Sequence, residues 1–147
     1  MIAGWRIQIR CSDRKKQNGS MTINSIMTGG EQLIEIDKIY NMDCLEGMKQ
    51  IEDNSIDLIV TDPPYNTGMQ KNDNAAWLRY FFNDKYTNEE YQKLVDIACK
   101  EMYRILKHDK LGYLFTNFKQ LGRWMITLQK TGFIVKNVIV WDKQIHG

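Results

Sequence analysis

One acidic residue, two adjacent prolines and one tyrosine follow directly on a short apolar run in this chain. The apolar run covers residues 56–61, and the four residues after it are Asp62, Pro63, Pro64 and Tyr65. Two prolines fix their own φ and favour extended geometry in the residue before them, so we expect Asp62 to be extended. Because proline has no N–H group, the carbonyl oxygens of Asp62 and Pro63 lack the usual local turn donors and are available to a ligand.

The groups of this tetrapeptide suit a flat ligand that carries an amino group. A carboxylate and an outward carbonyl oxygen are two acceptors, and an exocyclic –NH2 group offers two donors to match them. The ring of Tyr65 adds a face on which a base stacks, a contact worth about 1–3 kcal/mol in nucleic-acid sites. The residues therefore predict a pocket for an aminated base. The alternative is a simple strand-ending turn, in which Asp and Pro are common.

The sequence around the tetrapeptide resembles the DNA methyltransferases that methylate amino groups. The resemblance is carried by residues 39–48, 51–61 and 62–66, and it extends from about Leu33 to the end of the chain. It implies that the cofactor is S-adenosylmethionine, and that the substrate is the exocyclic nitrogen of adenine or cytosine in double-stranded DNA. Because of this resemblance, the interpretation of residues 62–65 as a simple strand-ending turn is the weaker one. An Asp in the first position of the motif is more similar to the adenine-N6 enzymes than to the cytosine-N4 enzymes.

The resemblance gives the tetrapeptide a catalytic role. It implies that the Asp62 carboxylate and the Pro63 carbonyl accept the hydrogen bonds of the target amino group. Pro64 stiffens the backbone, and Tyr65 stacks on the base, which must be flipped out of the duplex. Transfer is then direct, without a covalent enzyme intermediate and with no metal required, and positioning and charge stabilisation carry most of the catalysis.

Hydrophobic periodicity along residues 33–147 predicts alternating strands and helices. A capping box at Thr87 and Glu90 opens the longest expected helix, which has an apolar stripe and stops near His108 and Asp109. Such an alternation implies an α/β layered fold with a largely parallel sheet. The resemblance makes it a partial Rossmann-like methyltransferase sheet with flanking helices. The other expected elements are strands over 33–42, 56–61, 111–116 and 133–141, and helices over 45–51 and 118–130.

Three polar residues fall at the expected carboxyl ends of strands, where ligands bind in sheets of this kind. They are Asp43, Asp62 and Asn117, which we therefore expect along one rim. Asp43 is suited to cap the helix after it, while the resemblance implies contact with the cofactor, and the two roles are compatible. Cys44 is grouped with it in the cofactor region, although a cysteine there is more typical of packing than of a reactive thiol. Asn117 either lines the site or ends its strand, and we favour the latter.

The first part of the chain differs in composition from the rest. Residues 1–30 hold five basic residues against one acidic residue, whereas the whole chain has a net charge of +2. We interpret residues 1–32 as a flexible basic leader or upstream extension, and a DNA-binding arm is the alternative. The resemblance implies that residues 33–147 form the N-terminal part of a DNA methyltransferase catalytic domain. Between residues 66 and 84 lies a polar loop with an aromatic end, which suits packing or, alternatively, contact with the flipped base; its aromatic residues are Trp77, Tyr80, Phe81 and Phe82.

Composition limits the classes of protein to consider. The chain has 147 residues, 43% of them hydrophobic and 26% charged, which is typical of one globular, soluble domain. It has neither an apolar stretch of about 20 residues nor the apolar core of a signal peptide. Its three cysteines match neither a disulfide framework nor a zinc site, and His108 and His146 have no partner at metal-ligand spacing. We therefore expect a cytoplasmic protein without a resident metal.

The chain departs from the family in what it lacks. The related enzymes hold the methionine part of the cofactor in a Phe-x-Gly-x-Gly loop after a strand, and no such motif occurs here. The order of the motifs is similar to that of the permuted members, so the chain resembles their N-terminal half. Two strands of the family sheet would then be missing, leaving unpaired strand edges. Either the chain rearranges, or a second chain supplies the cofactor loop and the segment that reads DNA.

Two functions follow from these features. The first is a site-specific adenine methyltransferase, of the kind found in restriction-modification systems, with its cofactor loop supplied elsewhere. The second is a catalytically inactive remnant that binds DNA or a protein partner. A third interpretation, a small α/β protein of unrelated activity, requires the context of the tetrapeptide at residues 62–65 to be coincidental.

Overall fold

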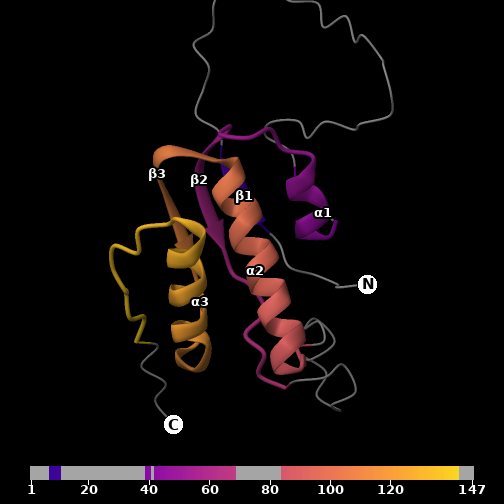
Figure 1. Cartoon of the computed structure of the whole chain (residues 1–147), viewed down its shortest axis with the longest axis vertical. Coiled ribbons are helices and arrows are strands. Elements are labelled where there is room, and N and C mark those ends of the chain that lie inside the picture. The colour runs from indigo at the N-terminus through magenta and orange to yellow at the C-terminus, as the bar shows by residue number, and fades with distance from the viewer. Residues whose placement is uncertain (1–6, 11–38, 41, 69–83, 143–147) are drawn as a thin grey trace, which may run out of the picture.

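The computed structural model describes residues 7–10, 39–40, 42–68 and 84–142. They form helices packed on a sheet whose three described strands lie in the order β1, β2, β3 (Figure 1). The elements in chain order are β1 (Ile7–Arg10), α1 (Cys44–Lys49), β2 (Ile56–Thr61), α2 (Asn88–Ile105), β3 (Leu106–Leu114) and α3 (Phe118–Thr131).

The sheet combines one parallel and one antiparallel pair of strands. β2 and β3 run parallel, as the alternation of strands and helices predicted, and β1 runs antiparallel to β2. The α/β fold with flanking helices is therefore confirmed. β1 lies within residues 1–32, where the sequence predicted no strand, and its residues Ile7 to Arg10 pair with Thr61 to Leu58.

The two faces of the β2–β3 pair differ in how they are covered. Ile59 and Thr61 of β2 are buried, and Figure 1 shows α2 and α3 on one side of the sheet. The alternate residues Leu58 and Val60 lie beside Leu111 and Tyr113 of β3. Because residues side by side in a parallel pair point to the same face, these four form one apolar surface, on which Leu111 and Tyr113 are about half exposed.

Helix α2 supplies more of the described core than any other element. Its first turn is fixed by the predicted capping box, in which Thr87 Oγ1 accepts from the Glu90 N–H and Glu90 accepts from the Thr87 N–H. Its buried side chains recur every three or four residues and pack against α1, α3 and β3. They are Tyr91, Leu94, Val95, Ala98, Cys99, Met102 and Ile105.

The end of α2 corrects the prediction that the helix stops near His108 and Asp109. The helix ends at Ile105, and β3 begins directly at Leu106. The carbonyl oxygens of Arg104 and Ile105 accept from the N–H groups of Asn54 and Ser55 in the turn before β2, so these backbone groups bond outside the helix. Regular pairing with β2 resumes at Leu111, the predicted strand start, after a bulge in which Asp109 has φ 60°.

The predicted strand over 133–141 is wrong. These residues follow α3, whose C-cap Gly132 has φ 116°, and they pair with none of the described strands. Phe133 packs edge-on against Tyr103 with ring centroids 5.2 Å apart, whereas Ile139 and Val140 are mostly exposed. An alternating apolar pattern forms a strand only when a neighbouring strand accepts its hydrogen bonds, and the described part of the chain offers none here.

Two further predictions fall largely outside the described residues. The expected strand over 33–42 is described only at residues 39, 40 and 42, none of which is in a strand. The aromatic residues of the 66–84 loop, Trp77, Tyr80, Phe81 and Phe82, lie outside the described residues altogether. The remaining predicted helices agree with α1 and α3, and the strand predicted over 56–61 agrees with β2.

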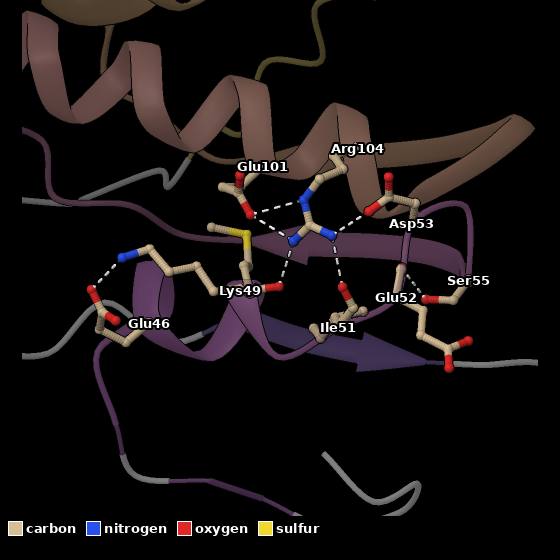
Figure 2. A network of polar contacts seen from close by, with 9 residues as sticks. Glu46, Lys49, Ile51, Glu52, Asp53, Ser55, Glu101 and Arg104 are labelled. Carbon is tan, nitrogen blue, oxygen red and sulfur yellow. Dashed lines mark hydrogen bonds and ion pairs between the residues drawn. The ribbon is translucent and has the colours of Figure 1, made fainter. Parts of the chain in front are cut away.

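One arginine joins the far end of α2 to the end of α1 (Figure 2). The Arg104 guanidinium donates to the carbonyl oxygens of Met48 and Ile51 over 2.7 Å each. It also pairs with the carboxylates of Glu101 and Asp53, both at 2.6 Å. The Gln50 and Ile51 N–H groups already donate to carbonyl oxygens of the last turn of α1. A guanidinium has five donors in a planar fork, so the Arg104 side chain adds charged donors to this backbone cap.

Replacing Arg104 by methionine tests this junction. Arg104→Met keeps much of the apolar stem but leaves two carbonyl oxygens at the end of α1 without their charged donors, so the free energy of unfolding should fall by about 1–3 kcal/mol. Urea denaturation followed by circular dichroism measures the change. Lys100→Met, at an exposed position of the same helix, is the matched control and should stay near the wild type. Equal losses in the two variants would contradict the role of Arg104.

Candidate active site

The tetrapeptide at 62–65, called the signature loop below, leaves the sheet at the carboxyl end of β2. The Phe115 N–H donates to the Thr61 carbonyl, so β2 and the end of β3 remain joined up to the point where the loop begins. Asp62 is exposed, Pro63 is buried, and Tyr65 is partly buried. The Asp62 carboxylate therefore faces outward, while the next residue of the loop is anchored in the protein.

One side chain from α2 and one from the N-cap of α3 hold two carbonyl groups of the loop. The Tyr91 hydroxyl donates to the Pro64 carbonyl over 2.6 Å, and the Asn117 amide donates to the Tyr65 carbonyl over 3.2 Å. Within the described residues, no hydrogen bond reaches the Pro63 carbonyl. The carbonyl groups of Pro64 and Tyr65 are therefore engaged by the protein, whereas no described residue donates to that of Pro63.

The backbone after the loop is held by one carboxylate. Asp84 accepts from the N–H groups of Asn66 and Thr67 over 2.6 and 3.0 Å, and from the Thr67 hydroxyl over 2.8 Å. Asn66 has φ 52°, a left-handed conformation that Asn tolerates well, and its side chain accepts from the Tyr86 N–H. Sequence reasoning missed Asp84, because no local pattern reports a contact across 18 residues of loop.

Asp62 and Tyr65 contact each other directly. The Tyr65 hydroxyl donates to one carboxylate oxygen of Asp62 over 2.5 Å. Burial, this hydrogen bond and the charges of Asp62 and Asp84 together raise the pKa of Tyr65, which therefore keeps its proton and remains a donor. One oxygen of Asp62 is thus oriented by the loop itself, and the other accepts from no described residue.

Asp43 caps α1, as one of its two expected roles requires. Its carboxylate accepts from the N–H groups of Leu45 and Glu46 over 2.9 and 3.3 Å. Burial, and then the negative charges of Asp84 and Asp43, raise the pKa of Tyr86. The negative charges of Asp43 and Asp84 therefore both act on the Tyr86 ring.

Cys44 faces the interior. Its side chain belongs to the core cluster, and burial together with the charge of Asp43 raises its pKa to about 12. Cys99, in the middle of α2, is fully buried, and its pKa is likewise raised to about 12 by burial. Both positions suit packing, and neither thiol is poised to react.

Asn117 does not end its strand, which is the role we favoured, because β3 ends at Leu114 and Asn117 is the N-cap of α3. Its side-chain oxygen accepts from the Gln120 N–H and caps α3, while its amide nitrogen reaches the Tyr65 carbonyl. It therefore contacts the site through the loop backbone. His108 is exposed in the bulge of β3. The described residues contain no group of three or more His, Cys, Asp or Glu side chains placed to hold a metal ion.

The fold and the loop together define a class of protein. A parallel strand of an α/β layer that ends in Asp-Pro-Pro-Tyr, with one carboxylate and one carbonyl left as acceptors, is the arrangement expected of an amino-group methyltransferase. A family model described as DNA methylase matches residues 56–147, which is more than half of the chain. The chain therefore belongs to this DNA methylase family.

Curated relatives agree with this assignment. The chain is 36% identical over 101 residues to the methylase YubD of Escherichia coli (strain K12), a match that covers 69% of this chain and 40% of that protein. It is 32% identical over 123 residues to the type II methyltransferase M.BglII of Bacillus subtilis, covering 76% of this chain and 30% of that protein. M.HpaI of Haemophilus parainfluenzae is 33% identical over 98 residues, covering 66% and 29%. The matches thus span less than half the length of these relatives.

The raised pKa of the two buried thiols predicts slow alkylation. At pH 8 a thiol with a pKa near 12 stays almost wholly protonated, so Cys44 and Cys99 should react with iodoacetamide at least about a hundredfold more slowly than in the unfolded chain. Peptide mass spectrometry of timed samples, with and without 8 M urea, measures both rates at each cysteine. A rate in the folded chain close to that in urea would contradict the burial of these thiols.

Proposed function

We propose that the chain holds the target base of an adenine-specific DNA methyltransferase, in which a methyl group passes from S-adenosylmethionine to the N6 nitrogen of a flipped adenine. The observation that carries the proposal is the division of acceptors in the signature loop. The Pro64 and Tyr65 carbonyls are bound by α2 and α3, whereas the Pro63 carbonyl and one oxygen of Asp62 accept from no described residue. Family membership supports the reaction class, and adenine is our own assignment.

The two available acceptors match the two protons of an adenine amino group. The lone pair of that nitrogen is delocalised into the ring, so the nitrogen is a poor nucleophile as it stands. Hydrogen bonds to Asp62 and to the Pro63 carbonyl draw it toward tetrahedral geometry and free the lone pair for attack. The ring of Tyr65, held next to Asp62 by its hydroxyl, is the proposed stacking face for the base.

S-adenosylmethionine supplies an electrophilic methyl group on a sulfonium centre when it is bound. Among the described residues Asp43 fits a contact with it, because one carboxylate oxygen caps α1 and no hydrogen bond among the described residues reaches the other. Cys44 belongs to the same region through its backbone, since its side chain is buried in the core. Asp43 and Cys44 would contact only part of an S-adenosylmethionine molecule.

The remaining contacts are proposed to come from elsewhere. We assign residues 33–147 to the first part of the catalytic domain and residues 1–32 to a basic leader. More than half of the length of each relative lies outside the match. We propose that a second chain supplies the corresponding parts, which are the cofactor loop and the DNA-reading segment. Double-stranded DNA is the proposed substrate, and the cytoplasm the proposed location. No helix in the described part of the chain is long and apolar enough to span a membrane.

A second candidate is a catalytically inactive remnant that binds DNA or a protein partner. It differs from the first candidate in that no other chain or segment supplies the Phe-x-Gly-x-Gly loop, a motif that residues 1–147 do not contain. The chain would then retain the signature loop and its supports without transferring methyl groups. DNA binding measured by fluorescence anisotropy, combined with no heat of cofactor binding in calorimetry, favours this candidate.

Methyl transfer with an Asp62 variant tests the proposal. The chain is incubated with tritiated S-adenosylmethionine and unmethylated genomic DNA, alone and with the unmatched C-terminal part of a related methyltransferase. Asp62→Asn should lower the rate at least about a hundredfold, because one acceptor of the amino group is replaced by a neutral amide. Chromatography of the hydrolysed DNA identifies the product as N6-methyladenine or N4-methylcytosine.

Glu52→Gln is the matched control for this experiment. Glu52 is an exposed carboxylate in the turn between α1 and β2, and its variant should transfer methyl groups at the wild-type rate. No transfer by the wild-type chain under either condition rejects the proposed function. N4-methylcytosine as the product rejects adenine as the target base but keeps the reaction class.

A further inference from the structure

A buried hydrogen-bond chain from α3 through α2 ends at the signature loop. Trp124 of α3 is 1% exposed and Tyr91 of α2 is 0% exposed. The Trp124 indole N–H donates to the Tyr91 hydroxyl over 3.2 Å, and the Tyr91 hydroxyl donates to the Pro64 carbonyl over 2.6 Å. The loop is thus tied to two helices through one hydroxyl group.

The direction of this chain is fixed by the chemistry of its members. An indole N–H only donates, so the Tyr91 oxygen must accept from Trp124. The single hydroxyl proton of Tyr91 is then directed to the Pro64 carbonyl. Burial raises the pKa of Tyr91, so this proton is retained. The hydroxyl therefore has one arrangement that satisfies both neighbours.

The ring of Tyr91 is held from several sides. The Arg123 guanidinium lies 5.4 Å from the ring centroid, and Arg123 donates to the carbonyl and side-chain oxygens of Asn88 at the start of α2. The Tyr86 ring packs 5.8 Å away at a tilt. The capping box fixes the same first turn of the helix. The position of the hydroxyl is therefore set before any ligand binds.

We propose, on the basis of the proposed function, that Tyr91 is a positioning residue for methyl transfer. By fixing the Pro64 carbonyl, its hydroxyl sets the direction of the adjacent Pro63 carbonyl and Asp62 carboxylate toward the amino group of the target base. A buried tyrosine needs some acceptor, and a purely structural role is the alternative. The alternative predicts that losing the hydroxyl weakens the core as a whole. Positioning predicts that the signature loop loosens first.

Hydrogen exchange of the full chain separates these roles. Tyr91→Phe keeps the ring and removes only the hydroxyl, so the amides of Asn66 and Thr67 directly after the loop should exchange about tenfold faster. Amides in the middle of β2, such as Ile59 and Val60, serve as the internal reference and should keep their rates. Nuclear magnetic resonance of ¹⁵N-labelled protein resolves each rate. Unchanged amides at 66–67, or equal acceleration at all four positions, overturns the proposal.

Two further variants complete the experiment. Tyr103→Phe, on the same helix at a half-exposed position, is the matched control and should leave the loop amides unchanged. If Tyr91→Phe does not fold, Trp124→Phe removes the donor that directs the Tyr91 proton, and the loop amides should exchange about threefold faster. A folded Trp124→Phe protein with wild-type loop exchange then overturns the proposal.

Methyl transfer gives the readout linked to function. In the assay described above, Tyr91→Phe should lower kcat at least about tenfold while KM for DNA stays within about threefold, because orientation rather than binding is lost. A rise in KM with unchanged kcat contradicts positioning. If the wild-type chain transfers no methyl groups, the proposed function fails, whereas the exchange rates still decide whether Tyr91 fixes the loop.

Discussion

The burial of one face of α2 is the constraint on which the rest of the described structure depends. The stripe from Tyr91 to Ile105 packs against α1, α3 and β3, and the carbonyl groups at its end bond to the turn before β2. Tyr91 and Arg104 are 13 residues apart on this helix, a separation of about 20 Å at the rise of an α-helix. One rigid element therefore positions both the signature loop and the end of α1.

In this arrangement the protein binds most of the backbone groups of the signature loop and leaves other polar groups of the loop without a described partner. The helices α2 and α3 bind two consecutive carbonyl groups, of Pro64 and Tyr65. Asp84 binds the two amides that follow. What remains at the mouth of the strand is a short row of acceptors that a rigid backbone keeps in place. A target amino group, as proposed above, would meet these acceptors with its two donors, and the chain belongs to a family of DNA methylases.

Local patterns predicted those elements whose causes are local. The apolar run at 56–61, the capping box at Thr87 and the stripe of α2 depend on nearby residues only, and β2 and α2 begin where these signals place them. The end of α2 was missed because turn residues Asn54 and Ser55 bind its last carbonyls. The strand expected over 133–141 has the right pattern but no partner among the described strands. In both cases the deciding hydrogen bonds come from elsewhere in the chain.

In the candidate site, too, local patterns predicted some residues and missed those whose contacts come from distant parts of the chain. Asp62, Pro63, Pro64 and Tyr65 were identified from their types and spacing alone. The groups that hold them, Tyr91, Asp84 and Asn117, come from separate elements. Tyr91 was predicted only as a member of an apolar stripe, since a periodicity reports that a ring is buried and says nothing of where its hydroxyl points. Contacts across 18 to 52 residues of sequence require the topology as well as the pattern.

The bulge in β3 sets the length of chain between the core and the site. Ile56 pairs with Leu106 and Thr61 with Leu114, so β3 uses three more residues than β2 over the same distance. With regular pairing Thr61 would lie beside Leu111, and Asn117 would stand about 10 Å too far along the strand to reach the Tyr65 carbonyl. The bulge acts as a spacer whose count of residues is constrained. Among its exposed members, Asp109 is restricted by its φ of 60° and Lys110 pairs with Asp57 over 3.7 Å. We expect insertions or deletions in the bulge to disturb the site more than a substitution of His108 does.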